Sequence, residues 1–211
     1  MRKVLMRTDY REFPCVSRGK VRDIYDLGET LMVVVTDRIS AFDHILPDGI
    51  PDKGRVLNTI SAFWFEKTGR IIENHLISYS TADLPEPLRK YSEELDGRFM
   101  IVKKARMLPV ECIVRGYISG SAWSEYKKSG SVCGLKPGDG MKESGKFDEP
   151  LFTPSTKAES GHDINISFEE MVNLVGAETA AKVKNASLAV YGECAKYALG
   201  KFDGKTFTPD H

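Results

Sequence analysis

The stretch VRDIYDLGETLMVVVT, residues 21–36, decides the fold of the first half of the chain. Its second part, Leu31 to Thr36, is a continuous apolar and β-branched run, which is typical of a strand covered on both faces. Its first part alternates loosely, and the segment Asp26–Glu29 carries turn chemistry. The stretch therefore predicts a β-hairpin from about residue 21 to residue 36, with Gly28 at its turn.

Outward from this hairpin, strands come first along the chain and helices come last. Ser167-Phe168-Glu169-Glu170 fits a capping box at the start of a helix, and helical spacing continues from Gly176 to Leu199. This order favours an α+β fold over an alternating doubly wound fold. The other predicted elements are a helix over 56–68, strands over 71–81, 99–104 and 110–118, a short helix over 121–129, and an exposed loop over 130–154.

Composition excludes several classes of protein. The 211 residues are 41% hydrophobic and 28% charged, which is ordinary for a globular protein and excludes a disordered chain, a collagen-like repeat and a coiled coil. Thirty basic residues balance thirty acidic ones. We therefore expect no nucleic-acid or membrane partner, although a local basic pocket for a phosphorylated small molecule stays open.

The cysteines and the N-terminal segment indicate a compartment. The four cysteines are far apart and show no metal-binding spacing, so we expect reduced thiols in a cytoplasmic protein. The start, MRKVLMRTDYREF, is broken by charges too early for a signal peptide. A homo-oligomer is compatible with this composition, which does not set the oligomeric state.

The first candidate site is SRGKVRDIY, residues 17–25. Gly19 permits close backbone approach, and the cations Lys20 and Arg22 alternate on one face of an incoming strand, where they can neutralise a polyphosphate. The pattern is neither a Walker loop nor GxGxxG. On its own, a solvated basic strand explains it better.

The second candidate is TDRISAFD, residues 36–43, which follows the buried strand. Loops at strand ends often hold ligands. The alternative is that Asp37 and Asp43 are turn residues that bond their own backbone.

The third candidate is LPVECIVRGYISGSAW, residues 108–123. Glu111 and Arg115 stand four residues apart in an apolar stretch, on the same face of a strand. Burying such charges is costly unless they are paired or bound to a ligand. A structural ion pair and a ligand site both remain open.

The fourth candidate is FTPSTKAESGHD, residues 152–163, where Lys157, Glu159, His162 and Asp163 fall within seven residues. The alternative interpretation is a polar loop that leads into a helix.

Taken together, these four segments, in this order, resemble the SAICAR synthetase family, phosphoribosylaminoimidazole-succinocarboxamide synthases of purine biosynthesis. The resemblance runs from about Ser17 to about Leu199. It implies an α+β fold with an antiparallel, β-rich, nucleotide-binding lobe, residues 1–105, and an α+β substrate lobe, residues 106–211, with a kinase-like ATP cleft.

The resemblance also implies a reaction. ATP, carboxyaminoimidazole ribonucleotide (CAIR) and L-aspartate would give SAICAR, ADP and phosphate. Because a carboxylate is a poor acceptor for an amine, ATP would first convert it to an acyl phosphate, which the aspartate amine attacks. Catalysis would rest on positioning and charge neutralisation, and Mg²⁺ would bridge the phosphates.

The matching motifs imply a role for each residue. The catalytic residues would be Lys20, Lys157 and Asp163. ATP would be bound by Gly19, Lys20, Val21, Arg22, Val35, Arg106, Met107 and Leu108. The other substrates would be bound by Asp37, Ser40, Asp43, Arg115, Ser121, His162 and Asp163.

The departure from the family lies after Leu199, where the chain reads GKFDGKTFTPDH. Family members continue with an acidic DTKFEFG-like strand and a TPDSSR-like motif that brings an arginine to the substrate phosphate. We expect the natural protein to carry both. The metal ligands cannot be assigned from the residues present.

Two other functions compete with this one. A small-molecule kinase with a similar ATP lobe would use Asp163 or Asp43 as a base for an alcohol and would need no aspartate. A non-catalytic nucleotide-binding protein would suit the departure after Leu199.

Overall fold

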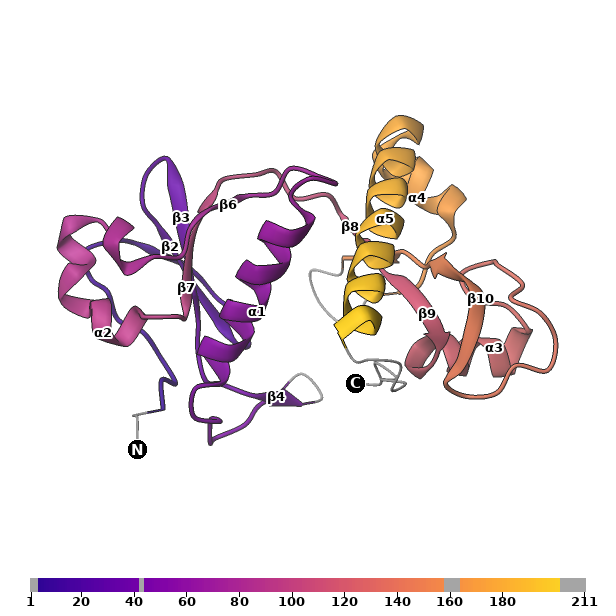
Figure 1. Cartoon of the computed structure of the whole chain (residues 1–211), viewed down its shortest axis with the longest axis horizontal. Coiled ribbons are helices and arrows are strands. Elements are labelled where there is room, and N and C mark those ends of the chain that lie inside the picture. Colours follow the sequence, from indigo (N-terminus) through magenta and orange to yellow (C-terminus); the bar gives the residue numbers. More distant parts are fainter. Residues whose placement is uncertain (1–3, 42–43, 158–163, 202–211) are drawn as a thin grey trace. The chain divides into compact units, whose positions relative to one another are not determined.

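The computed structural model describes residues 4–41, 44–157 and 164–201. The chain divides into two compact units, Met1–Arg106 and Met107–His211 (Figure 1). Both contain helices beside antiparallel strands, so the α+β fold class is confirmed.

The first unit contains a five-stranded antiparallel sheet, and the predicted hairpin lies at its centre. Arg22 pairs with Val35 and Asp26 with Leu31, and Gly28 occupies the turn with a φ of 94° that favours glycine. The sheet order is β1 (Cys15–Arg18), β2 (Arg22–Asp26), β3 (Thr30–Val35), β7 (Phe99–Lys103) and β6 (Leu76–Ser78).

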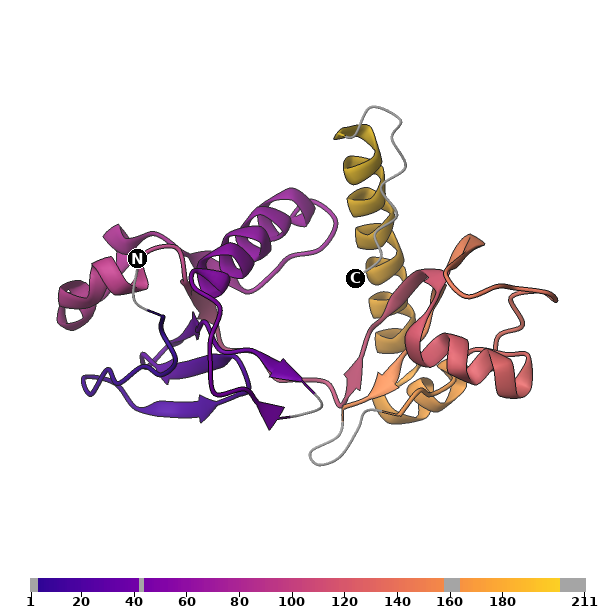
Figure 2. The ribbon, with the colours of Figure 1, turned by 90° about the horizontal axis from the view of Figure 1, so that it is seen from below.

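Both faces of strand β3 are covered, as its continuous apolar run predicts. Met32 and Val34 are fully buried in a core that also contains Leu88 and Leu95. These leucines belong to the short helices η2 (Glu86–Tyr91) and α2 (Ser92–Leu95). Alternate β3 residues pack on a second cluster beneath helix α1 (Lys53–Thr68), which lies across the sheet (Figure 2).

The buried residues of helix α1 are small or polar, and Phe65 is the large apolar residue of α1 that packs against the cluster on the sheet. Gly54, Asn58, Ala62 and Thr68 are its buried residues. A Cβ at Gly54 would collide with the carbonyl of Val35, so only glycine allows this close approach. Four other large apolar residues of α1 are exposed within the first unit, namely Val56, Leu57, Ile60 and Phe63.

The strand predicted over residues 71–81 is much shorter in the structure. Only Leu76–Ser78 forms β6. The N–H groups of Ile71 and Ile72 still bond the Thr68 carbonyl, so the backbone turns after α1 before it can extend. The short elements of this unit are β4 (Ser40–Ala41), β5 (His44–Ile45) and η1 (Thr81–Asp83).

The second unit corrects two sequence predictions. The single strand predicted over 110–118 is two strands, because β8 (Val110–Glu111) pairs with β11 (Ser155–Thr156) and β9 (Val114–Ile118) pairs with β10 (Gly145–Phe152). The loop predicted over 130–154 therefore contains a strand. Pro150 and a register shift between Lys146 and Leu151 interrupt the alternation that would have revealed β10.

The helices of the second unit agree with the sequence. They are α3 (Gly120–Ser129), α4 (Phe168–Val175) and α5 (Ala177–Lys201). The capping box is present, since the Glu170 N–H donates to the Ser167 hydroxyl at 3.1 Å and the Ser167 N–H donates to the Glu170 carboxylate at 2.7 Å. Helix α5 packs on β9, where a side chain at Gly116 would collide with the Tyr191 hydroxyl.

All four cysteines are free thiols. Burial, with a further contribution from the Glu125 carboxylate, raises the pKa of Cys133 to about 11, so this thiol is protonated at neutral pH. Among the described residues, no helix is both long and apolar enough to cross a membrane.

Candidate functional site

The predicted ATP-phosphate residues lie in the exposed turn between β1 and β2. The Gly19 N–H closes this turn by donating to the Arg22 carbonyl at 2.8 Å. Gly19, Lys20 and Arg22 are all exposed. The turn therefore displays two cations within three residues, an arrangement suited to phosphate oxygens.

Beneath this turn lies a buried ionic network. Asp23 is fully buried and accepts hydrogen bonds from Arg38 at 2.8 Å, Arg18 at 3.0 Å and the Thr8 hydroxyl at 2.7 Å. Burial alone would raise the pKa of Asp23, but the hydrogen bonds from Arg38 and Thr8 hold it below its ordinary value. The Asp23 carboxylate is thus ionised and shared among framework residues.

Asp37, predicted on the substrate side, is also fully buried. Its carboxylate accepts from the Leu5 N–H at 2.8 Å, the Gly54 N–H at 2.9 Å and the Arg98 guanidinium at 2.9 Å. Burial opposes ionisation, yet these hydrogen bonds lower the pKa of Asp37. Its role at the substrate stays a prediction, while its contacts join the N-terminal segment, α1 and the residue that precedes β7.

Ser40 and Asp43 are the two other residues predicted on the substrate side, and the structure describes only the first. Ser40 is half-buried at the start of β4. Asp43 lies outside the described residues.

The residues predicted at adenine come from both units. In the first unit, Val35 is buried and Val21 half-buried, and Thr36 donates two hydrogen bonds to the Val21 carbonyl. At the boundary between the units, Arg106 and Met107 are exposed. Leu108, in the second unit, packs against the cluster that contains Val110 and Phe152.

The structure brings together Arg115 and Ser121, the pair predicted at the imidazole nucleotide. Arg115 Nη2 donates to the Ser121 hydroxyl at 3.0 Å, and Arg115 Nε donates to the Thr153 hydroxyl at 3.2 Å. Thr153 is fully buried and reaches this position because β10 pairs with β9. Its contact with Arg115 was not predicted from the sequence, because the pairing of β10 with β9 joins residues that are distant along the chain.

Arg115 keeps a positive charge that no carboxylate among the described residues neutralises. Glu111 lies in β8, in a different sheet from Arg115, and the ion pairs of the described residues do not join the two. Both recorded partners of Arg115 are neutral hydroxyls. The positive charge of the Arg115 guanidinium is therefore not compensated by these partners and can bind an anionic ligand.

The fourth motif is described only in part. Lys157 is exposed, and its N–H donates to the Pro109 carbonyl at 3.2 Å, just beyond the β8–β11 pair. His162 and Asp163 lie outside the described residues. The structure therefore shows how the backbone at Lys157 is held.

A family model described as SAICAR synthetase matches residues 15–201. The chain belongs to the SAICAR synthetase family. Curated relatives named phosphoribosylaminoimidazole-succinocarboxamide synthase agree. That of Thermodesulfovibrio yellowstonii is 56% identical, over 95% of this chain and 69% of the relative. That of Geobacter metallireducens is 57% identical, over 95% of this chain and 68% of the relative.

Solved SAICAR synthetases share the fold. SAICAR synthase from Saccharomyces cerevisiae, complexed with SAICAR, matches with a TM-score of 0.85 and 43% identity, over 93% of this chain and 67% of that one. A type-2 SAICAR synthetase in complex with ADP matches with a TM-score of 0.69 over 88% of this chain and 69% of that one. At 20% identity, the second comparison shows the fold alone.

Membership of the SAICAR synthetase family makes this protein an ATP-dependent ligase of purine biosynthesis. The small-molecule kinase and the non-catalytic nucleotide-binding protein are not supported. Since the chain spans 68–69% of the first relatives' lengths, the matched region is the greater part of the SAICAR synthetase sequence.

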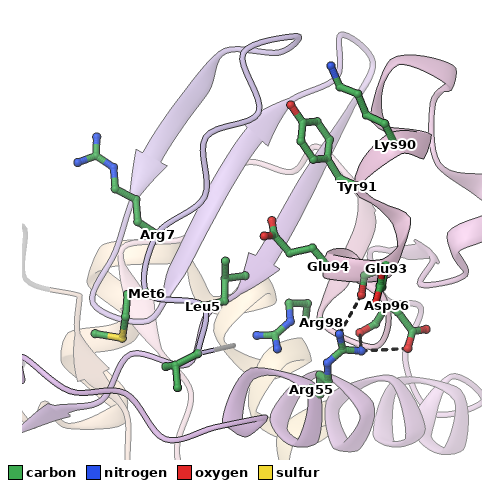
Figure 3. A pocket seen from close by; sticks show the side chains of 11 residues that line it. Leu5, Met6, Arg7, Arg55, Lys90, Tyr91, Glu93, Glu94, Asp96 and Arg98 are labelled. Atoms are coloured by element: carbon green, nitrogen blue, oxygen red, sulfur yellow. Dashed lines mark hydrogen bonds and ion pairs between the residues drawn. The ribbon is translucent and has the colours of Figure 1, made fainter. Parts of the chain in front are cut away.

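A cavity in the first unit lies apart from the SAICAR synthetase motifs. It has a volume of about 840 Å³ and sits between the N-terminal segment, α1 and α2 (Figure 3). Two of its cations are paired with carboxylates, since Arg55 bonds Asp96 at 2.9 Å and Arg98 bonds Asp37. Because these two charges are neutralised and no residue of the four motifs lines the cavity, we do not assign ATP to it.

Magnesium is implied by the use of ATP in this family. Within the part of the chain that the structure describes, no group of three or more His, Cys, Asp or Glu side chains could hold a metal ion. The two fully buried aspartates, Asp23 and Asp37, already bond arginines. We therefore assign no magnesium ligand among the described residues, and no step below runs through the metal.

Proposed function

We propose that this SAICAR synthetase joins the amine of L-aspartate to the carboxylate of CAIR through an acyl phosphate. A carboxylate oxygen of CAIR attacks the γ-phosphorus of ATP, and ADP leaves. The aspartate nitrogen then attacks the acyl carbon, phosphate leaves, and the nitrogen loses a proton. Membership of the SAICAR synthetase family is the observation that carries this proposal.

The first unit supplies the charge for the ATP phosphates. Lys20 and Arg22 lie on the exposed β1–β2 turn, where solvent-facing cations can approach phosphate oxygens. Gly19 lets the backbone come close to the nucleotide. Adenine then lies near Val21 and Val35, and bonds the backbone of 106–108.

The second unit supplies the site for the imidazole nucleotide. Arg115 is held by the hydroxyls of Ser121 and Thr153 and has no carboxylate partner among the described residues. Hydroxyls orient a guanidinium without cancelling its charge, because they accept hydrogen bonds as neutral groups. This is the arrangement expected of an arginine that binds an anionic substrate.

The remaining assignments rest on the motif matches. Lys157 neutralises the phosphate in transfer, and Asp163 with His162 shapes the acceptor site. Ser40 and Asp43 line the substrate side. Asp37 belongs to this set by its motif, although its buried contacts give it a framework role as well.

We further propose a cytoplasmic protein, in keeping with free thiols and a biosynthetic role. Mg²⁺ accompanies ATP in this proposal, with no ligands assigned. A homo-oligomer stays an expectation. CAIR, L-aspartate and ATP are the proposed small-molecule partners.

The activity is tested by measuring ADP release with CAIR present, with and without L-aspartate, together with the mass of the product. A ligase gives stoichiometric SAICAR and ADP when all three substrates are present. Sustained ADP release without aspartate, accompanied by a phosphorylated alcohol, would instead establish a kinase. A matched control is Arg55→Lys, which changes a charged residue of α1 whose side chain contacts none of the assigned residues and bonds Asp52, Glu93 and Asp96.

A further inference from the structure

Three successive backbone carbonyls of the β1–β2 turn are bonded to the segment that follows strand β3. The Val21 carbonyl accepts from the Thr36 N–H at 3.0 Å and from the Thr36 hydroxyl at 2.9 Å. The Lys20 carbonyl accepts from Arg38 Nε at 3.1 Å, and the Gly19 carbonyl accepts from Arg38 Nη2 at 2.9 Å. The turn is therefore held from one side along its whole length.

Arg38 is itself fixed firmly in place. Its side chain is only 9% exposed, and Nη2 also bonds the buried Asp23 carboxylate at 2.8 Å. Nη1 donates to the Met6 carbonyl at 2.8 Å. Every guanidinium nitrogen thus has a protein partner, so Arg38 is placed to act on the turn and not on a ligand.

The bonded carbonyls matter for the use of the turn. A carbonyl oxygen carries partial negative charge and would repel a phosphate that approached it. Arg38 engages two of these oxygens and so fixes the backbone from which the Lys20 and Arg22 side chains project. A forked guanidinium can bond two neighbouring carbonyls and a carboxylate at once, whereas a lysine ammonium is a single point.

We propose that Arg38 is the positioning residue of the ATP-phosphate turn, and that Thr36 assists it. This inference rests on the proposed function of the Gly19–Arg22 turn. It links the first two motifs structurally. Thr36 and Arg38, from the motif at residues 36–43, hold the backbone of residues 19–21 in the motif at residues 17–25. Arg38 has no other role among the site assignments.

The test is Arg38→Lys in the whole protein, with steady-state kinetics for each substrate. The variant keeps the charge beside Asp23 but loses the fork. We expect KM for ATP to rise roughly ten-fold, as for a displaced phosphate contact, with KM for L-aspartate unchanged. A merely structural role would lower the melting temperature and leave KM for ATP as it was.

Arg55→Lys is the matched control. Arg55 also bonds backbone carbonyls, those of Glu93 at 3.0 Å and of Asp96, as well as the Asp96 carboxylate. It does so far along the chain from the turn. We expect Arg55→Lys to lower the melting temperature without changing KM for ATP.

Thr36→Val tests the proposal if Arg38→Lys does not fold. It removes one hydroxyl donor to the Val21 carbonyl at nearly constant volume, and we expect about a three-fold rise in KM for ATP. An unchanged KM for ATP in the folded variants, with a raised KM in Lys20→Ala, would overturn the positioning role alone. If Lys20→Ala also leaves KM unchanged, the proposed function of the turn fails.

Discussion

Two arginines, one in each unit, occupy opposite electrostatic settings. Arg38 in the first unit is buried and bonded to the Asp23 carboxylate and three backbone carbonyls. Arg115 in the second unit is only half-buried, and its recorded partners are the hydroxyls of Ser121 and Thr153. Both guanidiniums are oriented by hydrogen bonds, but only the first is neutralised by its partners.

This difference separates a framework arginine, Arg38, from Arg115, which we propose binds a ligand. A buried charge needs a counter-charge, because removing it from water is costly. A half-buried guanidinium among hydroxyls retains its charge for an anionic ligand. The comparison predicts that substitutions in the first network lower stability and affect KM for ATP only through the β1–β2 turn, whereas substitutions at Arg115 change the affinity for CAIR directly.

The largest expected effect is on the framework side of this comparison. Asp37→Ala leaves Arg98, 3% exposed, without its hydrogen-bonded carboxylate partner, and should cost about 3–5 kcal/mol of unfolding free energy. Chemical denaturation measures this loss. Asp26→Ala, which removes a partly exposed pair with Lys104, should cost less than about 1 kcal/mol. Equal losses in the two variants would contradict the framework assignment.

Acid should act on the same framework. The pKa values of Asp23 and Asp37 are lowered in the folded protein, so their stabilisation is complete above the ordinary aspartate pKa of about 3.9. It is lost as pH falls through the lowered pKa values. Unfolding free energy should therefore decline steeply below about pH 4, and Asp37→Asn should flatten that decline. The same steepness in both proteins would refute this origin.

The next largest effect is expected in the β1–β2 turn, which the Asp23 and Arg38 network supports. Lys20→Ala should lower kcat/KM for ATP. The loss of transition-state stabilisation should be about 1.5–3 kcal/mol, the contribution of a charge-assisted contact. Because Lys20 is exposed, the melting temperature should barely change. Steady-state kinetics with varied ATP measures the effect. Normal turnover and a normal KM for ATP would remove Lys20 from the phosphate site.

A smaller effect is expected at the binding arginine. Arg115→Lys keeps the charge but loses the planar fork, so KM for CAIR should rise roughly ten-fold, or about 1.4 kcal/mol. KM for ATP should stay nearly constant. If the variant melts early and its kinetics are normal, Arg115 belongs with the framework arginines and the comparison fails.

The smallest effect tests whether the second unit can lose stability without losing affinity. Ser167→Ala removes the N-cap of α4 and should cost about 1 kcal/mol. KM for CAIR should be unaffected. Glu170→Gln keeps an acceptor for the Ser167 N–H and should lie closer to the original protein. A change in KM for CAIR would show that α4 and the Arg115 site are coupled.

The sequence predicted best those elements whose signal is local. The hairpin around Gly28 and the capping box at Ser167 are confirmed, because turn and cap chemistry depend on a few neighbouring residues. Strand β10 was missed, because its pairing with β9 is long-range and Pro150 breaks its pattern. The apolar spacing of α1 predicted the helix but not its orientation, since burial follows the close approach at Gly54.

For the candidate site, the motifs predict which residues take part, but the contacts of those residues are known only from the fold. The bond between Arg115 and Ser121 fits the predicted pair, whereas Thr153 required the β9–β10 register to be found. Asp37 shows the limit most clearly. A strand-end aspartate suggests a ligand residue, but only the fold shows that Arg98 and two backbone N–H groups occupy its carboxylate.

The sequence separation of these ion pairs also sets the order in which they can form during synthesis on the ribosome. Arg38 follows Asp23 by 15 residues, so this pair can close early, whereas Arg98 follows Asp37 by 61. At roughly 5–20 residues added per second, Arg98 is synthesised about 3–12 s after Asp37. Until then strand β3 lacks its neighbour β7 and presents an unpaired apolar edge. The first unit is therefore expected to need shielding by chaperones during this interval, and not afterwards.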